Sequence, residues 1–328
     1  MPGAVSVIIP HWNRRELLTV LLPLLGGQTL RPAEVIVVDN GSSDGSAEEA
    51  ERLGARVVLF ERNRGFAAAV NAGIRRAAGP WLAILNNDVE PRRDWLEKLV
   101  AGCEAAGVSY GCGKLLDARD PGRLDGTFDL ISRGAVAERA GHGRPDGEAW
   151  NEPRGIALAP LTAALFHRSV FEKVGELDER FESYLEDVDF GIRCALAGLK
   201  GRYVPEAVAS HWGSGTLGAW HPDTVRRIAR NQLLLIAKHY PANWVWHFGC
   251  EVVVAQLLWG AAAWRHGAGL AWARGKWEGA RALTGRERAP DLQVAEFLSA
   301  QQRELLELQK RHGFERLWRL YFRWTWAH

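Results

Sequence analysis

Short runs of β-branched residues alternate with helical patterns through the first part of the chain. The expected strands cover residues 5–10, 34–39, 57–60 and 81–85, and the expected helices cover 17–25, 47–53 and 66–78. Strand–helix units repeated in this way predict an α/β fold with a largely parallel sheet. Ligands of such sheets bind beyond the carboxyl ends of the strands. We therefore expect residues 10–13, 39–43 and 86–88 to converge on one site.

The remaining chain changes its pattern twice. Residues 117–153 are rich in Gly, Pro, Asp and Arg with little periodicity, which predicts a long loop or partly ordered flap on the acceptor side, and 158–166 look like a buried strand. Beyond residue 222 the pattern is helical, and residues 291–324 are expected to form one amphipathic helix that could dock or dimerise. The predicted domains are a catalytic domain, 1–218, with halves 1–116 and 117–218, and a helical region, 219–328.

Composition narrows the class of protein. The 328 residues are 47% hydrophobic, enough to fill a real core, and the formal charge of +2 gives no reason to expect nucleic-acid binding. Four scattered cysteines without CxxC spacing argue against a zinc site or a disulfide framework. The first ten residues lack the pattern of a secretory signal. These features fit a globular protein of the reducing cytoplasm.

Three acids, Glu186, Asp187 and Asp189, crowd the start of a helix expected over residues 190–199. One acid would serve as an N-cap and would interact favourably with the helix dipole. A cap needs only one, so the surplus suggests a site in which one carboxylate takes a proton while the others orient polar groups.

Two strand ends carry side chains suited to a nucleotide. Asp39 could accept hydrogen bonds from a base or a sugar hydroxyl, or it could close an Asx turn. Asn86, Asn87 and Asp88 could form a polar turn, but their oxygens are also hard ligands for Mg²⁺ or Mn²⁺ carrying a diphosphate. Neither GxGxxG nor GxxxxGK[ST] is present, which disfavours a dehydrogenase-type dinucleotide site and a P-loop.

Together these motifs resemble family 2 glycosyltransferases. The resemblance covers roughly residues 5–218 and rests on residues 5–10, 37–44, 63–65, 86–88 and 186–187, in the family's order and spacing. Because 203–205 and His211-Trp212-Gly213-Ser214 follow the acids, the chain looks most like the rhamnosyltransferase and galactofuranosyltransferase branch. The resemblance implies a GT-A nucleotide-diphospho-sugar transferase fold, with a mostly parallel Rossmann-like sheet, flanking helices and here a helical, aromatic-rich extension.

The resemblance also implies roles for single residues. The donor nucleotide and sugar would lie against Pro10, Trp12, Asn13, Asp39, Asn40, Asn63, Gly65, Asn71, Asn86 and Asn87. Asp88 and His211 would ligate Mn²⁺ or Mg²⁺, although His211 alone would more often be a satisfied histidine at a strand end. Asn86 stands where the strict family motif has Asp, so it compensates less of the metal's charge and can instead bind through water or contact the sugar.

The expected chemistry is direct displacement with inversion at the anomeric carbon. A cation would stabilise the departing diphosphate, and Asp187 would accept the proton of the attacking hydroxyl. Glu186 or Asp189 would hold acceptor hydroxyls or the helix start. Two alternatives remain open: a soluble transferase acting on a protein or small molecule, and a non-catalytic nucleotide- or glycan-binding homologue.

Nine of the fifteen tryptophans lie beyond Tyr240. Residues 243–264 are strongly apolar, but His247, Glu251 and Gln256 interrupt them, so we expect the segment to lie on a membrane rather than cross it. The nearby basic residues suited to anionic lipid are Arg265, Arg274, Lys276, Arg281, Arg286 and Arg288. The aromatic side chains could instead pack on the catalytic domain or on a second subunit. Expected partners are therefore a nucleotide-sugar donor, a glycan or polyprenyl-diphosphate-linked acceptor and the inner face of the cell membrane, with a homo-oligomer possible.

Overall fold

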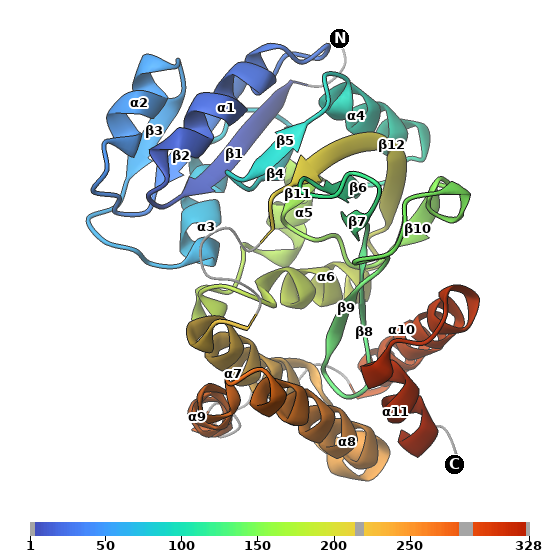
Figure 1. Cartoon of the computed structure of the whole chain (residues 1–328). Helices are drawn as coiled ribbons and strands as arrows, with labels where there is room; N and C mark the ends of the chain where they lie inside the picture. Colours follow the sequence, from blue (N-terminus) through green and yellow to red (C-terminus); the bar gives the residue numbers. More distant parts are fainter. Residues whose placement is uncertain (1–3, 214–219, 282–290, 326–328) are drawn as a thin grey trace. The chain divides into compact units, whose positions relative to one another are not determined.

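The computed structural model of the chain describes residues 4–213, 220–281 and 291–325, drawn in colour in Figure 1. The chain divides into two compact units. Unit 1 comprises Met1–Phe128 and Gly141–Gly215, and unit 2 comprises Asp129–Ala140 and Thr216–His328.

One mixed sheet forms the centre of unit 1 (Figure 1). In spatial order its main strands are β10 (Arg154–Ile156), β12 (Gly201–His211), β6 (Tyr110–Asp117), β11 (Ala163–His167), β4 (Trp81–Leu85), β1 (Val5–His11), β2 (Glu34–Asp39) and β3 (Arg56–Leu59). Strands β4, β1, β2 and β3 are parallel, as the alternating pattern predicted. The other half includes antiparallel neighbours, because β11 runs opposite to both β4 and β6.

Helices cover both faces of this sheet. One face carries α1 (Arg15–Gly26), α2 (Ser46–Arg52) and α4 (Trp95–Ala105). Leucines of α1 and α4 and Ala50 of α2 pack with Val5, Val7 and Ile9 in the main core. The other face carries α3 (Phe66–Arg76), α5 (Arg168–Val174) and α6 (Glu186–Leu196). Gly73 of α3 lets that helix lie close to β1, because a Cβ there would be 2.3 Å from Ile8 Cγ2. With both faces covered, β1 is buried at every position.

Two predictions for the middle of the chain need correction. The expected loop at 117–153 contains β7 (Leu124–Gly126), β8 (Asp129–Ile131), β9 (Ala137–Arg139) and the short 3-10 helix η1 (Glu148–Trp150). Strands of three residues are too short to show an alternating pattern in the sequence. They are fixed by their partners instead: β7 pairs with β6, while β8 and β9 form a hairpin that belongs to unit 2. The strand expected at 158–166 is confirmed only from Ala163 onward as β11. The three-residue β5 (Val89–Pro91), paired with β12, was not predicted.

Unit 2 is built from the hairpin and five helices among the residues described. These are α7 (Pro222–His239), α8 (Trp244–Arg265), α9 (Gly269–Ala280), α10 (Asp291–His312) and α11 (Arg316–Thr325). The single helix predicted for 291–324 is wrong: α10 ends before Gly313, whose φ of 86° is left-handed and incompatible with a continuous helix.

Helix α8 has the length and apolar composition of a membrane-crossing helix, yet about a third of its most apolar window is buried inside the structure. Its buried face packs in unit 2 through Phe248, Val252 and Ala255. Lys276, expected to face lipid, instead points inward and donates hydrogen bonds to Ala229 O (3.0 Å) and Gln232 Oε1 (2.7 Å). Arg286 and Arg288 lie outside the described residues.

Candidate active site

The loops that follow β1 and β2 hold each other at the carboxyl edge of the sheet. The Asn13 backbone N–H donates to Ser42 Oγ (2.8 Å), and Asn13 Oδ1 accepts from the Ser43 N–H (3.1 Å). Asn13 adopts a left-handed backbone, with φ of 53°, which asparagine tolerates better than most residues. Pro10 is buried within β1, whereas the Trp12 side chain is exposed.

His11 connects the end of β4 to the loops that follow β1 and β2. Its Nε2 lies 2.9 Å from Ser46 Oγ, and its Nδ1 lies 2.8 Å from Asn87 Nδ2. Burial lowers the pKa of His11, although nearby carboxylates oppose the effect, so the neutral ring is favoured. Because an amide nitrogen can only donate, Nδ1 accepts from Asn87 and Nε2–H donates to Ser46. His11 was not among the predicted site residues, and only its place at a strand end signalled it.

Two buried oxygen atoms at these strand ends have no hydrogen-bond partner among the described residues. Asp39 Oδ1 accepts from the Ser42 N–H (2.7 Å), which is the predicted Asx turn, but Asp39 Oδ2 is unpartnered. Asn86 Oδ1 is also buried and unpartnered. A buried acceptor without a donor is costly, so both atoms are poised for a ligand that brings hydrogen-bond donors or a cation.

Asn40 and Asn63 shape the neighbouring loop with their side chains. Asn40 Nδ2 donates to Gly65 O (3.0 Å), Asn40 Oδ1 accepts from the Arg64 N–H (2.8 Å), and Asn63 Oδ1 accepts from the Gly65 N–H (2.9 Å). Gly65 has φ of 89°, and a Cβ there would lie 2.8 Å from Glu182 O. This loop thus approaches the segment before α6 so closely that only glycine fits.

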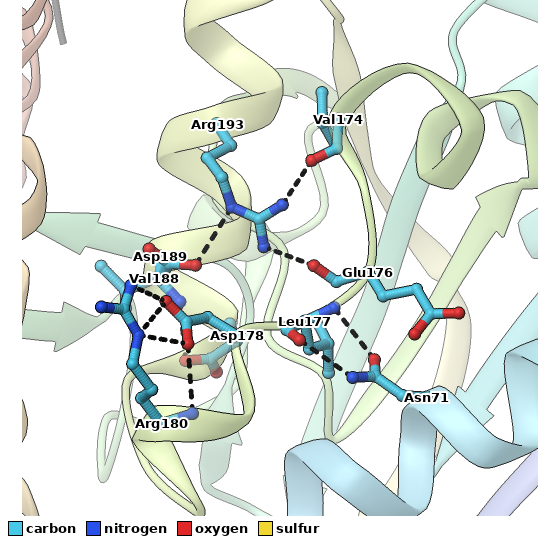
Figure 2. A network of polar contacts seen from close by, with 10 residues as sticks. Asn71, Val174, Glu176, Leu177, Asp178, Arg180, Val188, Asp189 and Arg193 are labelled. Atoms are coloured by element: carbon cyan, nitrogen blue, oxygen red, sulfur yellow. Dashed lines mark hydrogen bonds and ion pairs between the residues drawn. The ribbon is translucent and has the colours of Figure 1, made fainter. Parts of the chain in front are cut away.

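Asn71 ties α3 to the segment after α5, as Figure 2 shows. Its Nδ2 donates to Leu177 O (2.9 Å) and its Oδ1 accepts from the Leu177 N–H (2.9 Å). Both ends of the buried amide are therefore engaged within the protein, so Asn71 positions the backbone around the acids rather than offering its side chain to a ligand.

The three acids lie inside the first turn of α6, because the helix starts at Glu186 and not at the predicted residue 190. Glu186 is buried, and its Oε2 has no hydrogen-bond partner in the part of the chain that the structure describes. Burial raises the pKa of Glu186 well above its ordinary value, and the neighbouring charges of Asp187 and Asp189 add to the rise. Asp187 is only half-buried, with Oδ1 accepting from the Val188 N–H (2.8 Å). Of the three carboxylates, Asp187 is the most accessible.

Asp189 lies in the first turn of α6, at the helix start, which is one of the two roles expected for it. It is fully buried and forms an ion pair with Arg193, at 3.1 Å between Oδ2 and Nε. The same guanidinium donates to Val174 O (2.6 Å) and Glu176 O (2.9 Å), and Figure 2 shows it reaching from α6 to all three oxygens. Asp189 therefore orients Arg193, which clamps α6 to the end of α5, and it cannot hold an acceptor hydroxyl.

Asp88 and His211 meet between the end of β4 and the end of β12. His211 Nε2 lies 3.2 Å from Asp88 Oδ1, and His211 Nδ1 lies 2.8 Å from Asp125 Oδ2. Burial lowers the pKa of His211, but the hydrogen bonds and charges of Asp125 and Asp88 outweigh it and raise the pKa to about 9. Asp125, in β7, was missed because its residue stretch showed no motif.

The donor set at Asp88 and His211 fits a divalent cation. Asp125 holds the Nδ1–H side of the imidazole, which leaves Nε2 directed at the carboxylate of Asp88. Among the described residues no group of three or more His, Cys, Asp or Glu side chains forms a complete metal cage. The protein therefore offers a partial ligand set of carboxylate and imidazole, with the remaining positions left to a bound substrate and water.

Comparison with known proteins identifies the family of this fold. The family model described as Glycosyl transferase family 2 matches residues 6–175. The pre-mycofactocin glycosyltransferase of Mycobacterium tuberculosis is 31% identical over 228 residues, covering 66% of this chain and 44% of that protein. The N-acetylglucosaminyl-diphospho-decaprenol L-rhamnosyltransferase of the same organism is 29% identical over 238 residues, covering 64% of this chain and 74% of that protein.

Glycosyltransferase AglE of Haloferax volcanii is 37% identical over 118 residues, 34% of this chain. The chain spans only 39% of the length of AglE and 44% of the pre-mycofactocin enzyme.

Solved structures show the same architecture. GalNAc-T7, in a crystal structure with UDP, GalNAc and Mn²⁺, superposes with a TM-score of 0.61 at 14% identity, covering 98% of this chain and 56% of that one. The mannosyltransferase PcManGT of Pyrobaculum calidifontis, in complex with GDP-Man and Mn²⁺, has a TM-score of 0.53 at 19% identity, covering 98% and 86%. The α/β, GT-A fold expected from the motifs is confirmed. Since the family model matches just over half of its residues, the chain belongs to glycosyl transferase family 2.

Proposed function

We propose that this chain is an inverting glycosyltransferase that moves a sugar from a nucleoside-diphosphate sugar to a hydroxyl group of a glycan or lipid-linked acceptor. The observation that carries the proposal is the pair of buried, unpartnered oxygens, Asp39 Oδ2 and Asn86 Oδ1, at the carboxyl edge of the sheet. A nucleotide base or ribose brings the N–H and O–H donors that Asp39 lacks.

The diphosphate of the donor would lie near Asp88 and His211. These two side chains would hold Mn²⁺ or Mg²⁺, and Asn86 Oδ1 would contact the cation through water or the donor sugar directly. The cation would stabilise the charge of the departing diphosphate. The Mn²⁺ in the structures of GalNAc-T7 and PcManGT supports this choice of metal.

Asp187 would act as the general base. It is the accessible acid of α6, since Glu186 is buried with a raised pKa and Asp189 is engaged by Arg193. As the acceptor oxygen forms its bond to the anomeric carbon, the hydroxyl proton passes to Asp187. The bond between the anomeric carbon and the phosphate oxygen breaks, and the nucleoside diphosphate leaves with the electron pair. Attack opposite the leaving group inverts the anomeric configuration.

The acceptor we propose is a growing glycan carried on a polyprenyl diphosphate at the cytoplasmic face of the membrane. The rhamnosyltransferase relative, whose name specifies a diphospho-decaprenol acceptor, supports this class of substrate, and a UDP- or dTDP-linked sugar such as dTDP-rhamnose is the donor to test first.

Calorimetric titration tests the donor site. Purified protein is titrated with UDP, dTDP and GDP and their sugars, with and without Mn²⁺. We expect one nucleotide to bind in a metal-dependent manner, with binding weakened in Asp39→Ala and its metal dependence lost in Asp88→Ala. Asp120→Ala is the matched control, because that carboxylate is exposed at the surface and pairs with Arg123.

The outcomes separate the candidates. Absence of binding to every nucleotide by folded protein would overturn the donor site. Metal-dependent binding without transfer to any lipid-linked, glycan, protein or small-molecule acceptor would instead favour a nucleotide-binding homologue that has lost catalysis. Transfer to a water-soluble acceptor alone would favour a soluble transferase.

A further inference from the structure

Helix α8 exposes an uninterrupted apolar stripe along one side. Its exposed positions recur at helical spacing and comprise Trp246, Cys250, Val253, Leu257, Ala261 and Trp264, which we call the tryptophan stripe. Trp246 is 89% exposed, Leu257 60% and Trp264 57%. The stripe is about 27 Å long at 1.5 Å per residue, with a tryptophan at each end. Exposed apolar surface this continuous marks an interaction site.

The opposite face of α8 carries the polar side chains. Glu251 pairs with Arg133 at 3.3 Å, and Gln256 Nε2 donates to Gly134 O at 2.7 Å, both within unit 2. Gln256 also accepts a hydrogen bond from Lys276. The polar groups of the helix are thus satisfied inside the unit, while its outward side offers nothing but apolar and aromatic atoms between Val245 and Arg265, apart from His247 at one end. This is the reverse of an ordinary surface helix.

Cationic and aromatic side chains continue beyond the stripe. Arg265 follows Trp264 directly, and on α9 the exposed Trp277 lies under the guanidinium of Arg281, which is 3.8 Å from the ring centroid. Leu270 of α9 is also exposed, as is Arg274, whose guanidinium pairs with Glu278 at 2.9 Å. Tryptophan and arginine side by side suit the headgroup region of an anionic bilayer, where the ring is partly buried and the cation meets lipid phosphate.

We propose that the tryptophan stripe docks α8 flat on an anionic lipid bilayer. The helix does not cross the bilayer, because its other side packs in unit 2, where Glu251 and Gln256 contact their partners. Only one side is left for lipid, as in an interfacial helix. The surface deepens the proposed function, because a polyprenyl-linked acceptor would be presented at the same bilayer.

Vesicle binding tests the proposal without donor or acceptor, so its result is independent of the transfer reaction. The native thiol of Cys250 is exposed within the stripe, four residues after Trp246, whereas Cys103, Cys112 and Cys194 are buried. A polarity-sensitive maleimide dye can therefore be placed there selectively. We expect the full chain to float with phosphatidylcholine vesicles containing phosphatidylglycerol, to bind pure phosphatidylcholine more weakly, and to shift the dye emission to the blue.

Two exposed leucines give a matched pair of variants. Leu257→Glu lies in the stripe, and Leu59→Glu lies on β3 of unit 1, where the leucine is 65% exposed. We expect Leu257→Glu to weaken vesicle binding about tenfold or more, since burial of one large apolar side chain is worth at least that factor. Leu59→Glu should bind like the native chain. Both changes are on the surface, and circular dichroism verifies the fold.

Three results would overturn the proposal. The first is a folded native chain that binds neither kind of vesicle. The second is vesicle binding that Leu257→Glu leaves unchanged, which would place the contact elsewhere. The third is concentration-dependent dimerisation that Leu257→Glu abolishes, without vesicle binding, which would assign the stripe to a second copy of the chain.

Discussion

At the scale of single residues, environment separates three neighbouring carboxylates into three states. Asp187 is accessible, Glu186 is buried with an unpartnered oxygen, and Asp189 is buried in an ion pair. The sequence motif lists these acids together and cannot rank them, because their difference lies in what covers each side chain.

We expect Asp187→Asn to lower the turnover number about 100-fold or more, since the amide keeps the shape but cannot accept the proton. The dissociation constant of the nucleotide should stay within the error of the native value, because the change does not touch the donor site. Steady-state kinetics and titration on the same preparation measure both quantities. Equal losses in turnover and nucleotide binding would contradict the assignment.

The hydrogen bond between Asp125 and His211 predicts that Asp125 influences the affinity for the metal. If it fixes the His211 ring, then Asp125→Ala should weaken Mn²⁺ binding about tenfold or more, and Asp125→Asn, which retains an acceptor for Nδ1–H, should lose less. Electron paramagnetic resonance of free Mn²⁺ in the presence of nucleotide reports the affinity directly. Asp120→Ala again serves as the control, and unchanged Mn²⁺ affinity in Asp125→Ala would refute the positioning role.

The raised pKa of Glu186 predicts that the free energy of unfolding depends on pH. Its pKa is raised in the folded protein, mainly by burial, so the folded state binds a proton that the unfolded chain releases above its ordinary carboxyl pKa. The contribution of this carboxyl to stability is therefore complete below that ordinary value and falls as the pH rises toward the raised pKa. Glu186→Gln removes the titration. In urea unfolding, the variant should gain stability relative to the native chain as the pH rises from the ordinary carboxyl value of 4.5 toward neutrality. A constant difference across this range would show that Glu186 does not titrate in it.

At the scale of elements, Arg193 holds α6 and the end of α5 together. Its guanidinium joins α6 to the backbone after α5 and compensates a buried charge (Figure 2). Sequence periodicity located α6 to within four residues of its start, but these cross-connections involve backbone oxygens, which no residue pattern reveals.

Arg193→Met should lower the free energy of unfolding by about 3–5 kcal/mol, because it removes the guanidinium that pairs with the buried carboxylate of Asp189. Arg123→Met is the matched control. Arg123 also pairs with a carboxylate, that of Asp120, but the two side chains are 53% and 60% exposed, so the loss should be under about 1 kcal/mol. Urea unfolding of the two variants compares them, and similar losses would show that burial does not decide the cost.

At the scale of the whole molecule, the chain has two compact units with cores of their own. Leu99 is fully buried in the core of unit 1, and Leu298 is fully buried in unit 2. Because each unit has its own hydrophobic core, each can unfold in a separate cooperative transition.

We expect calorimetry to resolve two transitions, with Leu99→Ala lowering one and Leu298→Ala the other. Each change should cost about 2–5 kcal/mol in the unit that holds the cavity. A single transition lowered equally by both variants would show that the two units unfold as one.

The amino-acid pattern alone determined the parallel half of the sheet, most of its helices, the family and the strand ends at which Asp39 and Asn86 stand. These features are local or periodic, and strand periodicity, helix periodicity and turn chemistry act over a few residues. The pattern failed where distant segments complete each other: the short strands β7, β8 and β9, the break at Gly313, the inward Lys276 and the contact of Asp125 with His211. Only the tertiary structure decided these features, because burial, pairing and hydrogen bonding depend on neighbours that the order of residues does not place side by side.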